Sequence, residues 1–441
     1  MNIIFILLCC FIGFNIIKKT GIRRAQWLLI GLLFTLVDIT IIASPPITSH
    51  KLYLICFYIS LIKHNEFVKE IKTYPFKKIT LILLFLSFII AFLDDRLNFT
   101  SQIQRGFTNI LELSSLFIGY SCFKDAKEFK DIYKLIYKSL IIVCLYGLAT
   151  WIIKSNPYYD IVTSIFRNDG HGIWSGVQDR GYRVGSTFGN PIVYGFIMGI
   201  YFTMFFYFKD NKISHIPVLF LGLILSNIIF SNSRSNLVTL ALTIAIYLIL
   251  KYRFSSKLFL YLSSSILLII VSYIFLEPVQ KIFDSVFDIY LTGGINTNGS
   301  TIELKEQQQE FAYLFFLQAP WFGNGFDYFG EVIQQGKISF YNGELAGMEG
   351  YGYKLLVEQG AFMIIANLIY MIQIISFCIK KLNSTIAMIT LANFISFIFF
   401  IMLAGTYGGI MYLSLIPIGI NIKLMQIRSN KYSHHKQLKS H

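Results

Sequence analysis

Residues 384–404 read STIAMITLANFISFIFFIMLA, a stretch of 21 residues without one charged side chain. As a helix, this stretch is long enough to cross the roughly 30 Å hydrocarbon layer of a bilayer. Similar apolar stretches recur along the chain, and the predicted spans lie near residues 2–17, 25–43, 50–63, 78–94, 103–121, 135–153, 190–208, 213–231, 234–251, 256–276, 353–379, 384–404 and 407–425. Because lipid offers no water to exposed backbone groups, each span must be helical. The sequence therefore predicts an all-α polytopic integral membrane protein with about 13 transmembrane helices, within a range of about 12 to 14.

Composition and charge exclude a soluble domain and argue against nucleic acid as a partner. Hydrophobic residues make up 55% of the 441 positions and charged residues only 14%, yet the net charge is +14. The positive residues fall in alternate connections between spans, which is the positive-inside pattern. These clusters are Lys18, Lys19, Arg23 and Arg24; Lys63, Lys69, Lys72, Lys77 and Lys78; Lys124, Lys127, Lys130 and Lys134; Lys209 and Lys212; Lys251, Arg253 and Lys257; Lys380 and Lys381; and Lys423, Arg428, Lys431, Lys436 and Lys439. We therefore expect a multi-pass protein of the cell inner (plasma) membrane, with its N-terminus outside and its C-terminus in the cytoplasm.

Two polar insertions divide the predicted spans. The expected organisation is N-terminal transmembrane helices at 1–153, a smaller extracytoplasmic loop at 154–190, transmembrane helices at 191–276, a large extracytoplasmic loop at 277–352, C-terminal transmembrane helices at 353–425 and a basic cytoplasmic tail at 426–441. The six cysteines fall within predicted spans or, in the case of Cys122, directly after one, and no metal-ligand spacing occurs. We expect no disulfide, metal or cofactor.

Arginines on the outer side are the most informative polar residues, because the positive-inside rule does not explain them. The smaller loop ends in DRGYRVGSTFGNP (179–191), which contains Arg180 and Arg183, and a tight outer turn, SNSRS (231–235), contains Arg234. Guanidinium groups match phosphate oxygens and stay charged, so these three arginines are candidates for binding a diphosphate. The alternatives are that Arg180 pairs with Asp179 and that the other two contact lipid headgroups. Serines in the turn would then act only as helix N-caps.

The large loop predicts a surface helix followed by an aromatic turn. Residues 303–318 are amphipathic, with Leu304, Phe311, Leu314 and Phe315 on one side. This pattern is typical of a helix on the membrane surface, either a simple cover or a contributor of a substrate-binding cation through Lys305. The segment APWFGNGFDYFG (319–330) predicts a sharp turn whose Trp321 can stack on a sugar ring.

Carboxylates near the next span are candidate catalytic groups. Glu349 directly precedes the span and Glu358 lies about two turns inside it, where a charge is costly and is expected to be paired or functional. Partial burial would raise the pKa of Glu349 toward the range of a general base. The neighbouring Tyr351 and Tyr353 are candidate sugar contacts. A further intramembrane carboxylate, Glu112, is expected either to pair with Arg105 or an arginine of another span, or to act on the substrate directly.

The order of these motifs is similar to that of a known superfamily. RVGSTFGNP (183–191), SNSRS, PWFGNG (320–325) and YKLLVEQG (353–360) resemble the O-antigen ligase and O-antigen polymerase (Wzy-type) superfamily over roughly residues 180–380. The resemblance implies a fold like that of GT-C glycosyltransferases and a donor glycan attached to undecaprenyl diphosphate. It also implies that Arg183 and Arg234 hold that diphosphate. In the ligase branch a histidine occupies the position of Glu349, and this departure favours a polymerase.

The sequence therefore predicts a metal-independent polymerase of undecaprenyl-diphosphate-linked oligosaccharides, working at the outer face of the membrane. Fixed guanidinium groups would stabilise the departing diphosphate without a metal. A chain-length regulator and a flippase are the expected protein partners. The alternatives are an O-antigen ligase, a peptidoglycan glycosyltransferase of the shape, elongation, division and sporulation group, or a flippase or transporter for the same lipids. A flippase would be expected to distribute polar residues through many spans in two similar halves.

Overall fold

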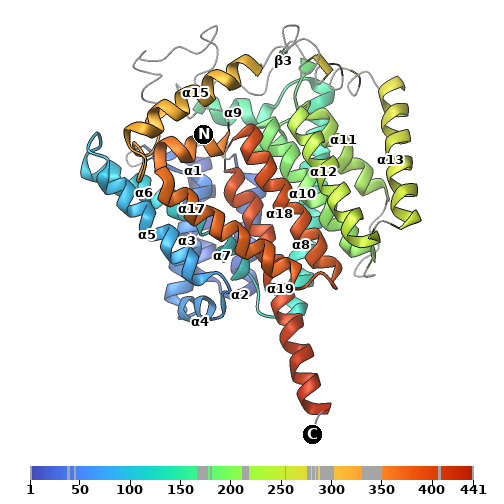
Figure 1. Ribbon diagram of the computed structural model, residues 1–441, viewed down its shortest axis with the longest axis horizontal. Helices are drawn as coiled ribbons and strands as arrows, with labels where there is room; N and C mark the ends of the chain where they lie inside the picture. Colours follow the sequence, from blue (N-terminus) through green and yellow to red (C-terminus); the bar gives the residue numbers. More distant parts are fainter. Residues whose placement is uncertain are drawn as a thin grey trace.

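The chain forms a bundle of helices, seen as a computed structural model that describes most of its length (Figure 1). The described residues are 2–36, 40–43, 46–165, 177–178, 181–210, 218–253, 255–275, 302–329, 350–405 and 409–439, with 280, 284, 287 and 288. The helices are α1 Asn2–Lys18, α2 Gly21–Phe34, α3 Ser49–Lys63, α4 Phe67–Thr73, α5 Lys77–Leu93, α6 Phe99–Leu113, α7 Ser115–Tyr120, α8 Ala126–Ile153, α9 Pro157–Ile165, α10 Pro191–Asp210, α11 Val218–Phe230, α12 Arg234–Tyr252, α13 Ser256–Phe275, α15 Ile302–Gln318, α17 Tyr351–Ile379, α18 Thr385–Ala404 and α19 Ile410–Lys439.

Several helices are long and apolar enough to cross a membrane. Among the described residues these are α8, α12, α17, α18 and the Ile410–Ser429 part of α19, and the bent pair α4–α5 is a sixth candidate. The apolar helices Ile4–Lys18, Pro191–Phe205 and Val218–Phe230 are shorter. The predicted all-α, membrane-embedded class is confirmed, whereas the count of thirteen spans stays a prediction.

The second predicted span, 25–43, is wrong in its C-terminal part. Helix α2 ends at Phe34, where the Thr35 hydroxyl donates to Gly31 O at 2.7 Å and the Thr35 backbone turns extended. The chain then forms a small antiparallel hairpin of β1 (Thr40–Ala43) and β2 (Pro46–Thr48). The β-branched residues of TII (40–42) favour a strand, and hydropathy alone does not separate that from a helix.

Other predicted boundaries shift for local reasons. The predicted span 103–121 is two helices, α6 and α7, which meet at Ser114. Helix α8 begins nine residues before the predicted 135, because the Asp125 side chain accepts from the backbone N–H groups of Lys127 and Glu128 and caps the helix there. Helix α19 continues to Lys439, so the predicted boundary between span and tail falls inside one helix.

Close helix packing in the centre depends on small residues and interhelical hydrogen bonds. A Cβ on Gly119 of α7 would collide with the backbone of Ile416 in α19, and a Cβ on Gly419 would collide with Leu116 O. Buried polar pairs also join the helices, including Tyr133 with Asn421 at 2.6 Å. Small residues and such pairs are the typical means of association where lipid removes the hydrophobic driving force between helices.

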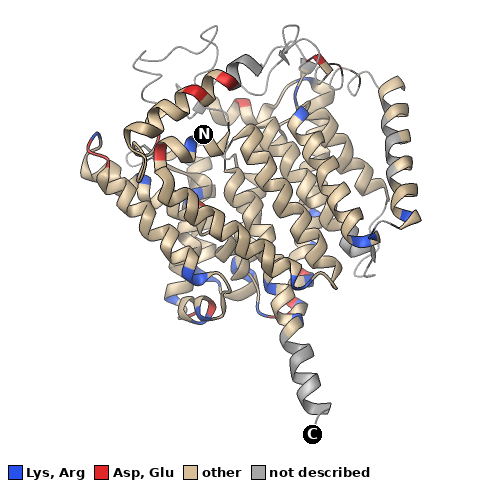
Figure 2. Ribbon diagram, viewed as in Figure 1, with Lys and Arg blue, Asp and Glu red and all other residues tan. Residues whose placement is uncertain are grey.

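The two ends of the bundle differ in charge. Lys and Arg gather at the end that lies at the bottom of Figure 2, where α4 lies and α19 leaves the bundle. We call this the basic end; it contains Lys18, Lys63, Lys77, Lys124 and Lys380. The opposite end, the loop end, contains α9, the short strand β3 (Val177–Gln178) and α15 (Figure 1). The strand β4 (Gly181–Tyr182) pairs with β3 there, and the β1–β2 hairpin connects the ends of α2 and α3 on the same side. The first helix starts at the loop end and the last one ends at the basic end.

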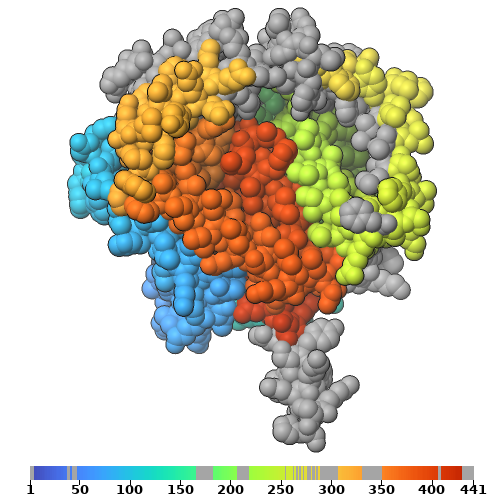
Figure 3. Space-filling view, in the orientation of Figure 1, coloured from blue at the N-terminus to red at the C-terminus, as the bar shows by residue number. Residues whose placement is uncertain are grey.

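The predicted helix at 303–318 is confirmed as α15, which lies across the upper part of α17 (Figure 3), and its place on the membrane surface stays a prediction. Its packed side agrees in part with the predicted apolar side, since Phe311 and Phe315 pack against the cluster of Ala312, Phe329 and Val357. Gln308 and Ala312 are buried, whereas Leu314 is exposed together with Tyr313 and Leu317. The predicted apolar side is therefore buried only in part, because Leu314 faces outward.

Candidate functional site

Helix α17 is broken in its third turn, at the loop end of the bundle. Gly360 has φ 70° and ψ −175°, a backbone conformation that interrupts the helix. Such a break leaves carbonyl and N–H groups without their usual partners four residues away, which is costly at membrane depth. Each of these groups must therefore find another partner.

The turn at 320–325 supplies the missing partners. On the N-terminal side of the break, Asn324 N donates to Val357 O at 2.8 Å and Gly325 N donates to Glu358 O at 3.1 Å. On the other side, Ala361 N donates to Pro320 O at 2.8 Å, and Phe362 N donates to Trp321 O at 3.2 Å. The predicted aromatic turn thus supplies the backbone hydrogen bonds that the broken helix lacks.

Glycines make this close backbone approach possible. A Cβ on Gly323 would collide with the backbone of Glu358 and Gln359, and one on Gly360 would collide with the backbone of 321–323. Gly323 and Gly360 also have positive φ, which favours glycine. The break and the turn therefore form one unit, which we call the Gly360 break.

Glu358 lies within this break and is 1% exposed. Its Oε2 lies 3.9 Å from Lys354 Nζ, which is an ion pair longer than a hydrogen bond, and Oε2 has no hydrogen-bond partner among the described residues. The Asp327 backbone hydrogen-bonds to the Glu358 carboxylate. A buried carboxylate with one free oxygen beside a lysine is suited to exchange a proton with a substrate hydroxyl.

An arginine from α6 holds the turn from the other side. Arg105 Nη1 donates to Phe326 O at 2.6 Å and lies 3.3 Å from Asp327 Oδ2. We call Glu358, Lys354, Asp327 and Arg105 the acid–base cluster. Its members come from three segments of the chain, and Arg105 lies more than 200 residues before the other three members. Sequence alone therefore does not predict that they meet.

A second ion pair supports the same turn. Arg96 binds Asp94 through Nε at 2.8 Å and Nη2 at 2.7 Å, and its guanidinium lies 4.8 Å from the centre of the Tyr328 ring. Gly325 packs directly against this pair, since a Cβ there would collide with Asp94. The loop between α5 and α6 is therefore part of the site's support.

Glu112 lies near the acid–base cluster. The cations that act on it electrostatically are Lys51 and Lys354, and the buried Tyr351 is close to both Glu112 and Glu358. The predicted pairing of Glu112 with Arg105 is not found among the described contacts, in which Arg105 binds Phe326 O and Asp327. The reason is that the turn of the large loop reaches Arg105 from outside the helix.

Arg183 is brought to the turn that precedes Arg234. Arg183 is 7% exposed, its Nε donates to Ser231 O at 3.4 Å, and Val184 N donates to Phe230 O at 3.0 Å. Arg234 is the first residue of α12 and is half-buried. We call Arg183 with residues 231–234 the arginine turn. Two of the three predicted arginines are thus gathered by one turn.

Serine capping does not account for this turn. Ser233 holds the N-cap position of α12 but makes no side-chain cap hydrogen bond, and the Ser231 hydroxyl donates to Ile228 O at 2.7 Å. Instead, the Asn236 side chain donates to Ser231 Oγ and to Pro191 O, tying α12 to the start of α10. The alternative that these serines serve as N-caps is therefore wrong.

Contacts at the loop end connect the arginine turn with the acid–base cluster. The Thr187 hydroxyl donates to Leu33 O at 2.7 Å, and the Ser49 hydroxyl donates to Leu36 O at 2.8 Å. Two residues further along α3, Lys51 acts on Glu112, which in turn lies near Lys354. Both groups therefore lie at the same end of the bundle and share supporting helices.

The other predicted site residues divide as follows. Arg180 and Glu349 lie outside the described residues, and of Lys305 only the backbone, in α15, is described. Trp321 is 60% exposed and stacks on Phe362, with 5.4 Å between the ring centres, on the outward apolar surface of α17. This position favours an anchor at the membrane interface over a sugar platform. Tyr353 packs beneath α15 against Phe329 and Val357.

Sequence analysis missed Lys354, Asp327 and the contacts of Arg105. Lys354 lies one turn before Glu358, and this spacing was an available signal of an intrahelical ion pair. Nothing in the sequence indicates which loop residue meets Arg105. Among the described residues, no group of three or more His, Cys, Asp or Glu side chains is placed to hold a metal ion.

Fold and site together define a membrane-embedded helical protein with a broken helix, an acid–base cluster and an arginine turn at one end. No protein-family model matches this chain, and no curated protein matches it significantly. The function must therefore be argued from the residues themselves.

Proposed function

We propose that this protein polymerises oligosaccharide repeat units linked to undecaprenyl diphosphate, at the outer face of the plasma membrane. In this proposal the loop end is extracytoplasmic, the basic end is cytoplasmic, and about 13 helices with a GT-C-like arrangement cross the bilayer. The observation that carries the proposal is the arginine turn, in which a nearly buried guanidinium is fixed at the same end of the bundle as the acid–base cluster.

The arginine turn fits a leaving diphosphate. Arg183 is held by Ser231 O, and its segment is anchored by Ser186, whose hydroxyl donates to Val143 O at 2.7 Å. A guanidinium that is already fixed in place needs little reorganisation free energy when negative charge develops on the departing group. Arg234, three residues from that carbonyl, adds a second cation to the same turn.

The acid–base cluster fits the acceptor. In the transfer, an acceptor hydroxyl oxygen bonds to the anomeric carbon while the bond from that carbon to the diphosphate breaks, and the diphosphate leaves with the electron pair. The hydroxyl proton passes to a carboxylate, for which Glu358 and Glu349 are the candidates. The Lys354 ammonium, 3.9 Å from Glu358, stabilises the ionised form that a base requires.

Reconstitution with one purified substrate tests this function. The protein is placed in vesicles with an undecaprenyl-diphosphate-linked repeat unit as the only glycan. A ladder of longer lipid-linked products is expected. Transfer to a lipid A core acceptor alone would show a ligase, and translocation without new glycosidic bonds would show a flippase; either result overturns the proposal.

Substitutions of the two arginines, with a control on the same helix, sharpen the test. Arg183→Ala and Arg234→Ala should each lower chain growth by about a hundredfold or more, the usual cost of losing a transition-state charge contact. Arg253→Asn removes an exposed arginine at the other end of α12, in a left-handed conformation that Asn tolerates. This control should leave the ladder unchanged, and equal ladders from all three variants would remove the diphosphate-binding role.

A further inference from the structure

The short helix α4 lies across the basic end of the bundle. It has seven residues and is bent by 115° from α5. If α5 crosses the bilayer, this angle places α4 nearer to the plane of the membrane surface than to its normal. Figure 1 shows α4 at the lower end of α5, opposite the site described above.

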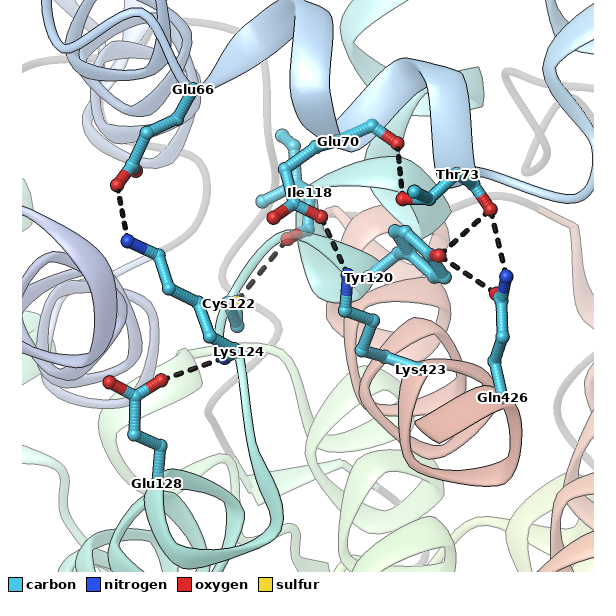
Figure 4. A network of polar contacts seen from close by, with 10 residues as sticks. All are labelled: Glu66, Glu70, Thr73, Ile118, Tyr120, Cys122, Lys124, Glu128, Lys423 and Gln426. Atoms are coloured by element: carbon cyan, nitrogen blue, oxygen red, sulfur yellow. Dashed lines mark hydrogen bonds and ion pairs between the residues drawn. The ribbon is translucent and has the colours of Figure 1, made fainter. Parts of the chain in front are cut away.

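Both carboxylates of the α4 region, Glu66 and Glu70, form ion pairs with cations of other segments (Figure 4). Glu66 binds Arg24, a 1% exposed arginine, at 2.9 Å and Lys124 at 2.8 Å. Glu70 binds Lys423 of α19 at 2.7 Å. The negative charge of this segment is therefore neutralised by three cations of other segments.

The C-terminal end of α4 is fixed by further polar contacts. The Tyr120 hydroxyl lies 2.9 Å from Thr73 O and 2.7 Å from Gln426 Oε1, and Gln426 Nε2 donates to Thr73 O at 3.0 Å (Figure 4). Phe67, at the other end of α4, packs against the rings of Tyr58 and Phe117. The helix is therefore held against the bundle at both of its ends, and its other side faces outward.

The outward side of this region is cationic. Lys63, Lys69, Lys72 and Lys78 are exposed, and within the described part of the chain no ion pair involves them. We call these four side chains the α4 lysine surface. Lys77 differs from them, because its Nζ donates to Lys72 O at 3.0 Å. Two exposed apolar residues, Ile62 and Val68, lie among the lysines.

We propose that the α4 lysine surface binds the headgroups of anionic phospholipids in the adjacent leaflet. This inference rests on the separation of charge in the segment. Its glutamates bind Arg24, Lys124 and Lys423 on the inward side, whereas its four exposed lysines have no protein counterion among the described residues. A helix that lies along the membrane surface with lysines and exposed apolar side chains matches the chemistry of an anionic lipid surface. The inference holds whatever reaction occurs at the loop end.

Lipid binding by the full-length protein tests this proposal. Bound phosphatidylglycerol and phosphatidylcholine are measured by native mass spectrometry from mixed micelles, and the melting temperature is followed as each lipid is added. We expect phosphatidylglycerol to bind and raise the melting temperature, and phosphatidylcholine to do neither. Inorganic phosphate added as a competitor should not displace the lipid, which separates a lipid headgroup site from a site for free phosphate.

Variants assign the binding to these side chains. Changing Lys63, Lys69, Lys72 and Lys78 together to Gln should weaken phosphatidylglycerol binding by roughly 600-fold, since each surface lysine contributes about fivefold. The same four changes to Arg should preserve binding. The matched control changes Lys127, Lys130 and Lys134 of α8, which are exposed near the same end, to Gln and should leave binding unchanged.

Three results would overturn the proposal: unchanged binding in the four-glutamine variant, equal losses in that variant and the α8 control, or equal binding of the two lipids. If the four-glutamine variant does not fold, the salt dependence of lipid binding by the wild-type protein tests the proposal instead. Raising the salt from about 50 mM to about 500 mM must then weaken phosphatidylglycerol binding, because exposed charges are screened within a few ångströms at high salt. Salt-independent binding would contradict the electrostatic basis.

Discussion

At the scale of single residues, Glu358 is the side chain whose surroundings are hardest to explain by packing alone. It is 1% exposed, its nearest cation is 3.9 Å away, and its Oε2 is without a hydrogen bond within the described structure. A purely structural carboxylate would be expected in a shorter, fully bonded pair. The geometry is therefore more consistent with a group that awaits a substrate proton.

The substitution Glu358→Gln tests this role. Glutamine keeps the shape of the side chain but cannot accept a proton, so chain growth should fall by about 10² to 10⁴-fold, the usual contribution of general acid–base catalysis. The KM for the lipid-linked unit should change far less than kcat. Product ladders and initial rates from reconstituted vesicles measure both.

The control for this experiment is Glu306→Gln, which removes an exposed carboxylate from α15 at the same end. It should retain the wild-type rate. An active Glu358→Gln protein with an unchanged pH profile would show that the carboxylate only supports the Gly360 break, and Glu349 would then be the remaining candidate base.

At the scale of elements, the break in α17 depends on backbone conformations that only glycine adopts easily. Gly360→Ala should destabilise the protein by about 2 kcal/mol or more, because alanine at φ 70° is strained and its Cβ would meet the backbone of the 320–325 turn. Thermal unfolding in detergent measures the loss. Activity should fall as well, because the turn positions Asp327 beside Glu358.

Gly222→Ala is the matched control for that substitution. Gly222 lies inside α11, and an added Cβ there has nothing within 4 Å. Alanine is also the better helix former, so the stability of this variant should stay equal or rise slightly. Equal stability of Gly360→Ala and Gly222→Ala would show that the break is not required for the fold.

The ion pairs of α4 predict a dependence of stability on pH. Burial opposes ionisation of Glu66, but the hydrogen bond from Lys124 and the charges of Arg24 and Lys124 outweigh it and hold the pKa of Glu66 below its ordinary 4.5. A lowered folded-state pKa gives stabilisation that is present above the unfolded-state pKa and is lost as pH falls through the folded-state value. The melting temperature should therefore be flat near neutral pH and fall at pH below about 4.5.

Glu66→Gln separates this contribution from that of the other acids. It should cost about 2 kcal/mol at neutral pH, the loss of a charge-assisted hydrogen bond, and should make the decline in acid shallower. Melting curves between about pH 3 and pH 7 compare it with wild type and with Glu306→Gln, which should follow the wild-type curve. Parallel curves for Glu66→Gln and wild type would contradict the assignment.

At the scale of the whole molecule, hydropathy predicts elements well where an apolar stretch and a helix coincide. The predicted spans 234–251 and 384–404 agree with α12 and α18 to within a residue. The prediction fails at 25–43, because Thr40–Ala43 is as apolar as a helix end but forms a strand. Contacts such as Arg105 with Phe326, 221 residues apart, cannot be predicted, because they depend on how a long loop folds back.

The candidate site was predictable to a similar degree. Glu358, Arg183 and Arg234 were identified because a charge at such a position in an apolar chain needs a reason. An aromatic residue in a turn, such as Trp321, predicts a sugar contact, but its outward stacking on Phe362 depends on the orientation of the turn over α17. Residue type thus indicates which chemistry is available, and packing decides which side of an element displays it.

The orientation of the bundle in the membrane decides whether the site can meet its proposed substrate, and accessibility labelling tests it. In a cysteine-free background, which includes replacing the exposed Cys10, single cysteines are placed by Gln309→Cys on α15 and by Lys72→Cys on α4. An impermeant maleimide added to intact cells without an outer membrane should label Gln309→Cys at once. It should label Lys72→Cys only after permeabilisation, because the two positions lie at opposite ends of the bundle and the lysine-rich end is retained inside. The reverse result would place the arginine turn and the acid–base cluster in the cytoplasm, away from any exported glycan. Labelling of both cysteines in intact cells would contradict the membrane-crossing arrangement itself.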